Sequence, residues 1–317
     1  MFQAEKASLS FVIPVYNEEE TLQILYQKIV EVMDSVSSTK YEIIFIDDGS
    51  TDNSWQKICQ IHSQGKGKVK GFKFRKNFGK ASALALGFEE SKGEIVFTLD
   101  ADLQDDPENI PSFLEKLDEG WDVVSGWKKD RKDPLEKKIP SKIFNFIVSL
   151  TTGLKLKDMN CGFKAYRKDL LHHIYLYGEL HRYIPVLAHN SGFSVTEIPV
   201  THFPRKFGVS KYGLERYLKG FFDLLTVIFI TRFLQRPLHF FGLGGIVAGV
   251  VGGAILFILS INKIFFGIDI EARPLFFLGI LCVLFSGQPM SIGILGEHLN
   301  RLTFKPDESA KVFQRIG

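Results

Sequence analysis

Three groups of acidic residues lie close to short apolar segments of the sequence. Glu18 ends the segment Pro14–Glu18, two carboxylates open the segment Asp47–Asp52, and Asp100 and Asp102 open a third. Alternate residues of an extended segment point the same way, and two carboxylates that share one side need a cation to offset their repulsion. Asp100 and Asp102 therefore predict a cation site.

The predicted cation is Mg²⁺ or Mn²⁺. These ions prefer hard oxygen ligands and are usually held by one or two carboxylates together with the phosphates of a substrate. The predicted protein ligands are Asp100, Asp102 and Gln104. A metal held in this way would face a nucleotide diphosphate and stabilise it as it departs.

Each acidic group also has an ordinary structural explanation when it is taken alone. Asp48-Gly49-Ser50 is a common turn sequence, and Ser50 or Asp52 could cap a helix. The functional interpretation depends on the joint placement of the three groups. The sequence contains no glycine-rich phosphate loop of the GxxxxGK[ST] or GxGxxG type, which argues against an NTPase and against a dinucleotide-dependent oxidoreductase.

Apolar, β-branched segments alternate with amphipathic ones through the first 126 residues. This alternation predicts an α/β fold with a mainly parallel sheet covered by helices on both faces. The expected strands are Leu9–Val15, Glu42–Ile46, Val69–Phe74, Ile95–Leu99 and Val123–Ser125, and the expected helices are Glu18–Ser37, Asn53–Gln64, Lys80–Ser91 and Pro107–Glu119. Ligands of such sheets bind at the carboxyl ends of the strands, where the acidic groups lie. Beyond Gly126 the alternation stops, and we expect the basic stretch Lys128–Lys142 to leave the sheet and form part of an acceptor site.

Two long uncharged runs follow, Phe240–Ile261 and Pro274–Gly296. Both reach the roughly 20 residues that a membrane-spanning helix needs, and the first is rich in glycine. The alternative is a pair of buried helices in a globular domain. Basic residues before and after the pair favour a helical hairpin with both ends on the cytoplasmic side of the cell membrane. No secretory signal opens the chain, so the N-terminal domain is expected in the cytoplasm.

The predicted organisation has four parts. A cytoplasmic domain covers residues 1–214, an amphipathic interfacial helix 215–236, a two-helix transmembrane hairpin 237–300, and a cytoplasmic tail 301–317. A plain linker is the alternative for the interfacial helix. The formal charge of +3 is too small to predict nucleic-acid binding, and the three cysteines form no CxxC pair that would indicate zinc or a disulfide framework.

Four strings together resemble family 2 glycosyltransferases, within them the polyprenyl-phosphate branch of dolichol-phosphate mannosyltransferases and bactoprenol glucosyltransferases. The strings are Pro14–Glu18, Asp47–Asp52, Arg75–Lys80 and Asp100–Pro107. The resemblance covers about residues 8–215, and the two-helix tail is similar to the bactoprenol-type members. It implies a GT-A-like fold.

The resemblance also implies roles for individual residues. Asp100 and Asp102 match the metal-binding DxD motif of the family, with Gln104 as an additional ligand. The residues expected to hold the nucleotide sugar, by side chain or by backbone and packing contacts, are Pro14, Tyr16, Glu18, Ile46, Asp48, Asp100, Ala101 and Asp102.

The second half of the chain is similar to the acceptor half of the family, from Asp158 to Tyr166 and from His202 to Tyr212. Basic side chains on a loop just before the membrane could bind a lipid phosphate, or simply anionic head groups. The residues expected to contact the acceptor phosphate are Arg131, Ser141, Arg205 and Lys211. Asp158 either binds sugar hydroxyls and accepts a residual proton or caps a turn. The predicted catalytic residues are Asp102, Asp158 and Arg205.

The expected reaction is inverting transfer of a hexose from a nucleotide sugar to polyprenyl phosphate at the cytoplasmic membrane face. The membrane tail favours glucose from UDP-glucose, and mannose from GDP-mannose is the alternative. A processive polysaccharide synthase is disfavoured because no clear QxxRW motif is present, and the intact Asp100 and Asp102 argue against an inactive scaffold. Expected partners are the bilayer, a second copy of the chain, a flippase and a downstream transferase.

Overall fold

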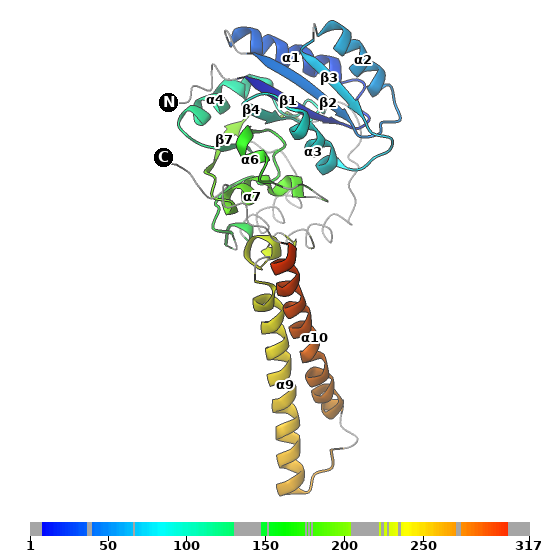
Figure 1. Cartoon of the computed structure of the whole chain (residues 1–317), viewed down its shortest axis with the longest axis vertical. Helices are drawn as coiled ribbons and strands as arrows, with labels where there is room; N and C mark the ends of the chain where they lie inside the picture. Colours follow the sequence, from blue (N-terminus) through cyan, green and yellow to red (C-terminus); the bar gives the residue numbers. More distant parts are fainter. Residues whose placement is uncertain are drawn as a thin grey trace. The chain divides into compact units, whose positions relative to one another are not determined.

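The computed structural model describes residues 8–129 except 37–39 and 66, residues 147–203 except 151, 175, 177 and 179, and residues 222–303 except 223, 224, 227, 234, 235 and 271–273. The chain divides into two compact units, one within residues 1–223 and one within residues 224–309 (Figure 1).

The described part of the first unit contains a seven-stranded sheet with the strand order β3-β2-β1-β4-β6-β5-β7. Strand β6 runs antiparallel to its two neighbours, and every other neighbouring pair is parallel. The strands are β1 (Leu9–Val15), β2 (Tyr41–Asp47), β3 (Val69–Lys73), β4 (Ile95–Thr98), β5 (Val123–Lys128), β6 (Lys164–Arg167) and β7 (Val195–Val200). The predicted mainly parallel sheet is confirmed.

Helices cover both faces of this sheet (Figure 1). Ile43 and Phe45 of β2 pack into a core with α1, α2 and α4, whereas Ile44 and Ile46 pack with α3. Burial on both faces explains why residues 43–46 of β2 form a continuous apolar run rather than an alternating one. The described helices of the first unit include α1 (Leu22–Ser35), α2 (Ser54–Gln64), α3 (Lys80–Glu90), η2 (Pro107–Asn109), α4 (Ile110–Asp118), α6 (Lys168–Leu171), η3 (Leu180–Tyr183) and α7 (Ile184–Asn190).

The five predicted strands agree with β1 to β5 to within a few residues, but the expectation that the basic stretch leaves the sheet at Lys128 is wrong for that residue. Strand β5 continues to Lys128, where it pairs with Val200 of β7. Strand β6 has only four residues and charges at both ends, so its sequence carries little β signal. Tertiary pairing with β4 and β5 makes it a strand. Residues 130–142, the rest of the expected acceptor segment, lie outside the described residues.

The second unit contains α9 (Pro237–Phe266) and α10 (Pro274–Thr303), which lie side by side, preceded by the π-helix η4 (Phe229–Phe233). A helix of 30 residues is about 45 Å long, more than the roughly 30 Å hydrocarbon core of a bilayer. Both helices are long and apolar enough to cross a membrane. Their apolar side chains are largely exposed, whereas those of a core helix in a soluble protein would be buried.

Glycines allow α9 and α10 to approach closely. A Cβ atom added to Gly245 would lie 2.5 Å from the backbone oxygen of Ser286, and one added to Gly252 would lie 2.7 Å from that of Gly279. Small residues at such contacts are typical of helix pairs that associate in lipid, where the hydrophobic effect supplies no attraction. Most of the expected interfacial helix and of the tail lies outside the described residues, and both stay predictions.

An aromatic cluster joins the sheet to α4 beneath the carboxyl end of β4. Phe97 is fully buried, and its ring centroid lies 5.2 Å from that of Phe11 and 5.9 Å from that of Phe113. We expect Phe97→Ala to destabilise the first unit by about 3–5 kcal/mol, because it removes a large buried side chain and leaves a cavity. Thermal unfolding of the purified full-length protein in detergent measures this. The control is Ile24→Ala on α1, where the side chain is 39% exposed. Equal shifts in Tm for the two variants would show that Phe97 is not a core residue on which the stability of the first unit depends.

Candidate active site

The loops that follow β1 and β2 are tied together by hydrogen bonds. The backbone N–H of Asn17 donates to Ser50 Oγ at 2.9 Å, the N–H of Thr51 donates to Asn17 Oδ1 at 2.8 Å, and the N–H of Glu18 donates to Ser54 Oγ at 2.8 Å. Asn17 has a φ of 55°, a left-handed conformation that asparagine tolerates better than most residues. These bonds hold the 16–18 segment against the amino end of α2.

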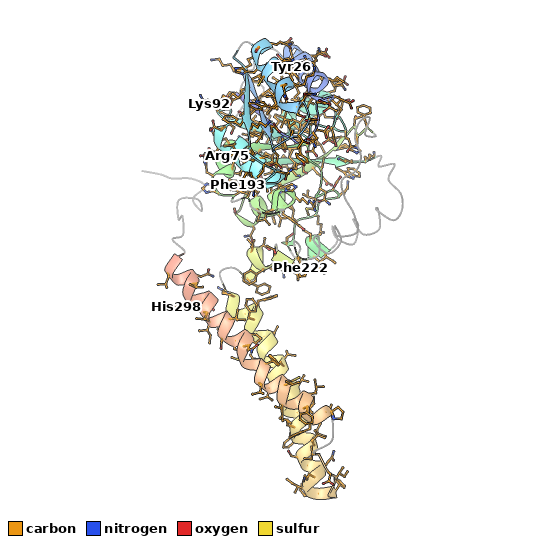
Figure 2. The ribbon with its side chains drawn as sticks, turned by 90° about the vertical axis from the view of Figure 1, so that its right-hand side faces the viewer. Tyr26, Arg75, Lys92, Phe193, Phe222 and His298 are labelled. Carbon is orange, nitrogen blue, oxygen red and sulfur yellow. The ribbon has the colours of Figure 1, made fainter. Side chains whose placement is uncertain are left out.

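Asp48 organises the loop between β3 and α3. Its buried carboxylate accepts the backbone N–H groups of Phe78 at 2.7 Å and Gly79 at 2.9 Å. Burial raises the pKa of Asp48, and the two N–H groups oppose that rise. The neighbouring Gly49 is required here, because its φ is 73° and an added Cβ would lie 2.4 Å from the backbone carbon of Lys76. Both oxygens of Asp48 therefore position this loop, which carries the exposed Arg75 labelled in Figure 2.

Asp100 follows β4 and forms an ion pair with Lys80, the first residue of α3. Burial opposes the ionisation of Asp100, but the Lys80 ammonium outweighs burial and lowers the pKa of the carboxyl to about 2. The carboxylate is therefore ionised at neutral pH. Gly162 lies directly against it, since a Cβ added there would be 2.6 Å from Asp100 Oδ2.

Asp102 reaches its position through a turn. Strand β4 ends at Thr98, so the expectation that strand alternation aligns Asp100 with Asp102 is wrong, and Leu103 has a φ of 59°. Asp102 is largely buried, and its Oδ1 accepts the backbone N–H of Gln104 at 3.2 Å. The Gln104 amide donates through Nε2 to the Phe203 carbonyl at 3.4 Å, while no described residue engages its Oε1.

The donor set fits a hard divalent cation that substrate oxygens complete. Among the described residues, no cluster of three His, Cys, Asp or Glu side chains could hold a metal by itself. The protein offers the two carboxylates of Asp100 and Asp102 and the Oε1 atom of Gln104, and Mg²⁺ and Mn²⁺ commonly take only one or two carboxylates with substrate phosphates. The three predicted metal ligands thus have suitable chemistry.

A cavity of about 140 Å³ opens beside Asp100, between α3, the β4–β6 part of the sheet and η3. Asp102 does not line it. The polar and charged side chains that line the cavity include Lys80, Asp100, Lys164, Tyr166, His181 and Arg182.

The cavity is electropositive. Burial lowers the pKa of Lys164. Burial, reinforced by Lys80 and Arg182, lowers the pKa of His181 to about 2, so this imidazole stays neutral near pH 7. Lysine and arginine side chains that surround a neutral histidine indicate that the cavity favours a negatively charged group.

A second buried ion cluster supports the loop after Asp102. Lys128 Nζ lies 3.5 Å from Asp105 Oδ1, and His202 Nδ1 lies 3.3 Å from the same oxygen. Burial disfavours the charged form of Lys128, but the Asp105 carboxylate together with Asp100 and other nearby acidic groups raises its pKa. The N–H of Phe203 donates to the Gln104 carbonyl at 2.8 Å. The segment after β7 is thereby joined to the predicted metal loop.

The remaining predicted site residues have diverse environments. Asp158 is buried, and its Oδ1 accepts the N–H of Asn160 at 3.0 Å, as a turn-capping residue would, while no described residue hydrogen-bonds to its Oδ2.

Pro14 lies within β1, and Ile46 lies within β2 with its side chain fully buried. Ala101 is buried beside Asp100. The acceptor-phosphate residues Arg131, Ser141, Arg205 and Lys211 lie outside the described residues.

The sequence alone assigned no individual role to Lys80 or Lys164. Lys164 had a detectable signal, because it is the one charge between Phe163 and Tyr166 in an otherwise apolar string. Its partners could not be seen, since β6 was not recognised as a strand.

The family model for glycosyl transferase family 2 matches residues 10–175, which include β1 to β6 and the carboxylates of the candidate site. This chain belongs to glycosyl transferase family 2.

Two curated relatives align with nearly the whole chain. A dodecaprenyl-phosphate galacturonate synthase of Rhizobium johnstonii is 36% identical over 315 residues, which are 98% of this chain and 93% of that protein. An undecaprenyl-phosphate 4-deoxy-4-formamido-L-arabinose transferase of Edwardsiella ictaluri is 34% identical over 93% of this chain and 89% of that protein.

Solved structures show the same fold for the first unit. Glucosyl-3-phosphoglycerate synthase of Mycobacterium tuberculosis, in complex with Mn²⁺, UDP-glucose and phosphoglyceric acid, aligns with a TM-score of 0.55 and 18% identity over 72% of this chain and 81% of that chain. The GT-A-like α/β fold is thereby confirmed.

A substitution at Gly162, which contacts Asp100, tests the predicted metal site without replacing a predicted metal ligand. We expect Gly162→Ala to displace the Asp100 carboxylate and to weaken Mn²⁺ binding in the presence of a nucleoside diphosphate by roughly 10-fold or more. Electron paramagnetic resonance of a Mn²⁺ titration measures this directly. The control is Gly253→Ala on α9, where an added Cβ meets nothing within 4 Å. Unchanged Mn²⁺ affinity in Gly162→Ala would remove Asp100 from the metal site.

Proposed function

We propose that this chain transfers a hexose from a nucleotide sugar to a polyprenyl phosphate at the cytoplasmic face of the cell membrane, with a divalent cation bound by Asp100, Asp102 and Gln104. The observation that carries the proposal is the alignment of a dodecaprenyl-phosphate sugar transferase with 98% of this chain. The alignment extends over the catalytic domain and the two apolar helices alike. A polyprenyl phosphate is itself a membrane lipid, so an enzyme that uses it benefits from a membrane anchor.

The reaction follows from the chemistry of the two substrates. A phosphate oxygen of the acceptor attacks the anomeric carbon, the bond from that carbon to the diphosphate breaks, and the nucleoside diphosphate leaves. Direct displacement inverts the anomeric configuration. A phosphate is largely ionised near pH 7, so the attack requires no strong general base. Asp158, with one buried oxygen that no described residue engages, is available to bind a sugar hydroxyl or accept a residual proton.

Charge stabilisation does most of the catalytic work in this proposal. A bound Mg²⁺ or Mn²⁺ would supply positive charge against the departing diphosphate. Lys80 holds Asp100 ionised and in place. Arg205 and Lys211, with Arg131 and Ser141, are proposed to hold the acceptor phosphate, because guanidinium and ammonium groups bind phosphate well.

This proposal does not specify which sugar is transferred. The sequence analysis favoured glucose, whereas the names of the two relatives specify galacturonate and 4-deoxy-4-formamido-L-arabinose. If the product is made on the cytoplasmic face and used on the other, a flippase and a downstream transferase must follow. A homo-oligomer stays a prediction.

A transfer assay tests the proposal. Purified full-length protein is incubated with polyprenyl phosphate, Mg²⁺ or Mn²⁺ and labelled nucleotide sugars, including UDP-glucose, GDP-mannose and UDP-galacturonate, and label in the lipid extract is counted. We expect label with at least one donor and a loss of at least about 100-fold in Asp102→Ala, which removes a metal ligand. No label with any donor would overturn the transferase proposal, and unchanged activity in Asp102→Ala would overturn the metal assignment.

Charge reversal at Arg205 tests the proposed division between donor and acceptor sites. We expect Arg205→Glu to raise the KM for polyprenyl phosphate by roughly 10- to 100-fold, because a charge-assisted phosphate contact becomes a repulsive one, and to leave the KM for the donor unchanged. Steady-state kinetics with each substrate varied in turn measures both values. Lys92→Glu, an exposed site on the loop before β4, is the matched control (Figure 2). A change in donor KM alone would show that the division is wrong.

A further inference from the structure

We infer that the cavity beside Asp100 receives a carboxylate carried by the transferred sugar, so that the donor is a nucleotide-linked uronic acid and Lys164 selects for it. This inference rests on the proposed function and narrows its substrate class. A uronic acid is a hexose oxidised to a carboxylate at C6, so it remains within the expected hexose class.

Lys164 is the central observation. Its side chain lines the cavity, yet the residue is only 3% exposed. Within the described residues its ammonium donates one hydrogen bond, to the Cys161 carbonyl, and has no ion-pair partner. An ammonium has three donors, and a buried charge without a counter-ion is costly. A ligand that brings a negative charge into the cavity would remove this cost.

Among the other cavity charges, Lys80 and Asp100 already form an ion pair. Arg182 also lines the cavity and has interactions of its own. The ammonium of Lys164 adds one positive unit, which a single carboxylate matches. The neutral His181 adds hydrogen-bonding capacity to the cavity wall without adding charge.

The position of Lys164 limits which substrate group can reach it. Lys164 pairs with Thr98 in the sheet, two residues before Asp100, so it lies on the sheet side of the cavity. The donor diphosphate is an internal group with a nucleoside on one side and a sugar on the other, and the acceptor phosphate carries a long lipid chain. The C6 carboxylate of a sugar lies at the edge of the ring and can enter such a cavity alone.

Matched donor pairs test the inference with the full-length enzyme. UDP-glucose is compared with UDP-glucuronate, UDP-galactose with UDP-galacturonate, and GDP-mannose with GDP-mannuronate. The two members of each pair differ only at C6, where one carries a hydroxymethyl group and the other a carboxylate. Binding is measured by calorimetry with Mn²⁺, and transfer is measured with polyprenyl phosphate. We expect the uronate to be favoured in at least one pair by roughly 10- to 100-fold, the value of one charge-assisted contact.

The variant Lys164→Gln, which removes the charge but can still donate to the Cys161 carbonyl, should abolish this preference. The preference is a ratio within one preparation, so a partly unfolded sample does not alter it. Lys70→Gln, which removes a surface ammonium paired with Glu42, is the control and should keep the wild-type ratio. If Lys164→Gln fails to fold, the donor preference of the wild-type enzyme still decides the question.

Several results would overturn the inference. Transfer of uncharged hexoses without any preference for a uronate would reject it and leave the proposed function intact, whereas no transfer with any donor would reject the proposed function. An unchanged preference in Lys164→Gln would reject the role of this residue. A weaker affinity for UDP or GDP alone would assign Lys164 to the diphosphate, and a higher KM for polyprenyl phosphate alone would assign it to the acceptor phosphate.

Discussion

The parallel alignment of β1, β2 and β4 is the constraint on which the candidate site depends. Because these strands run in one direction, the loops that follow them meet at one edge of the sheet, and segments that are distant in sequence supply Glu18, Asp48 and Asp100 together. Burial of Ile43 and Phe45 on one face and of Ile44 and Ile46 on the other maintains this alignment. A slip of one residue would exchange the two buried faces, so the register is strongly specified.

The antiparallel strand β6 adds the second half of the site. It enters the sheet between β4 and β5 in the opposite direction, so its amino end lies beside the carboxyl end of β4. This geometry places Gly162 against Asp100 and Lys164 in the wall of the same cavity. A parallel strand at this position would have carried them to the opposite edge.

Ion pairs then fix the loop that carries the predicted metal ligands. Lys80 holds Asp100, while Lys128 and His202 hold Asp105. The backbone hydrogen bond from Phe203 to Gln104 joins this loop to the segment that leads in sequence to Arg205. The loop that carries the proposed metal ligands is thus tied to the segment that precedes the proposed acceptor residue Arg205 in the sequence.

The sequence by itself determined the first five strands, the helices between them and the two long apolar helices, because hydrophobic periodicity and segment length are local properties of the chain. It also identified Asp100, Asp102 and Gln104 as chemically suited to a hard cation. Only the tertiary structure decided that Lys164 lies beside Asp100 and that Asp48 uses both of its oxygens on the β3–α3 loop. The reason is physical: β6 is too short and too charged to show β propensity, and its place in the sheet arises from pairing with strands far away in the sequence. The carboxylates were visible in the sequence, whereas the cavity beside Asp100 was created by the fold.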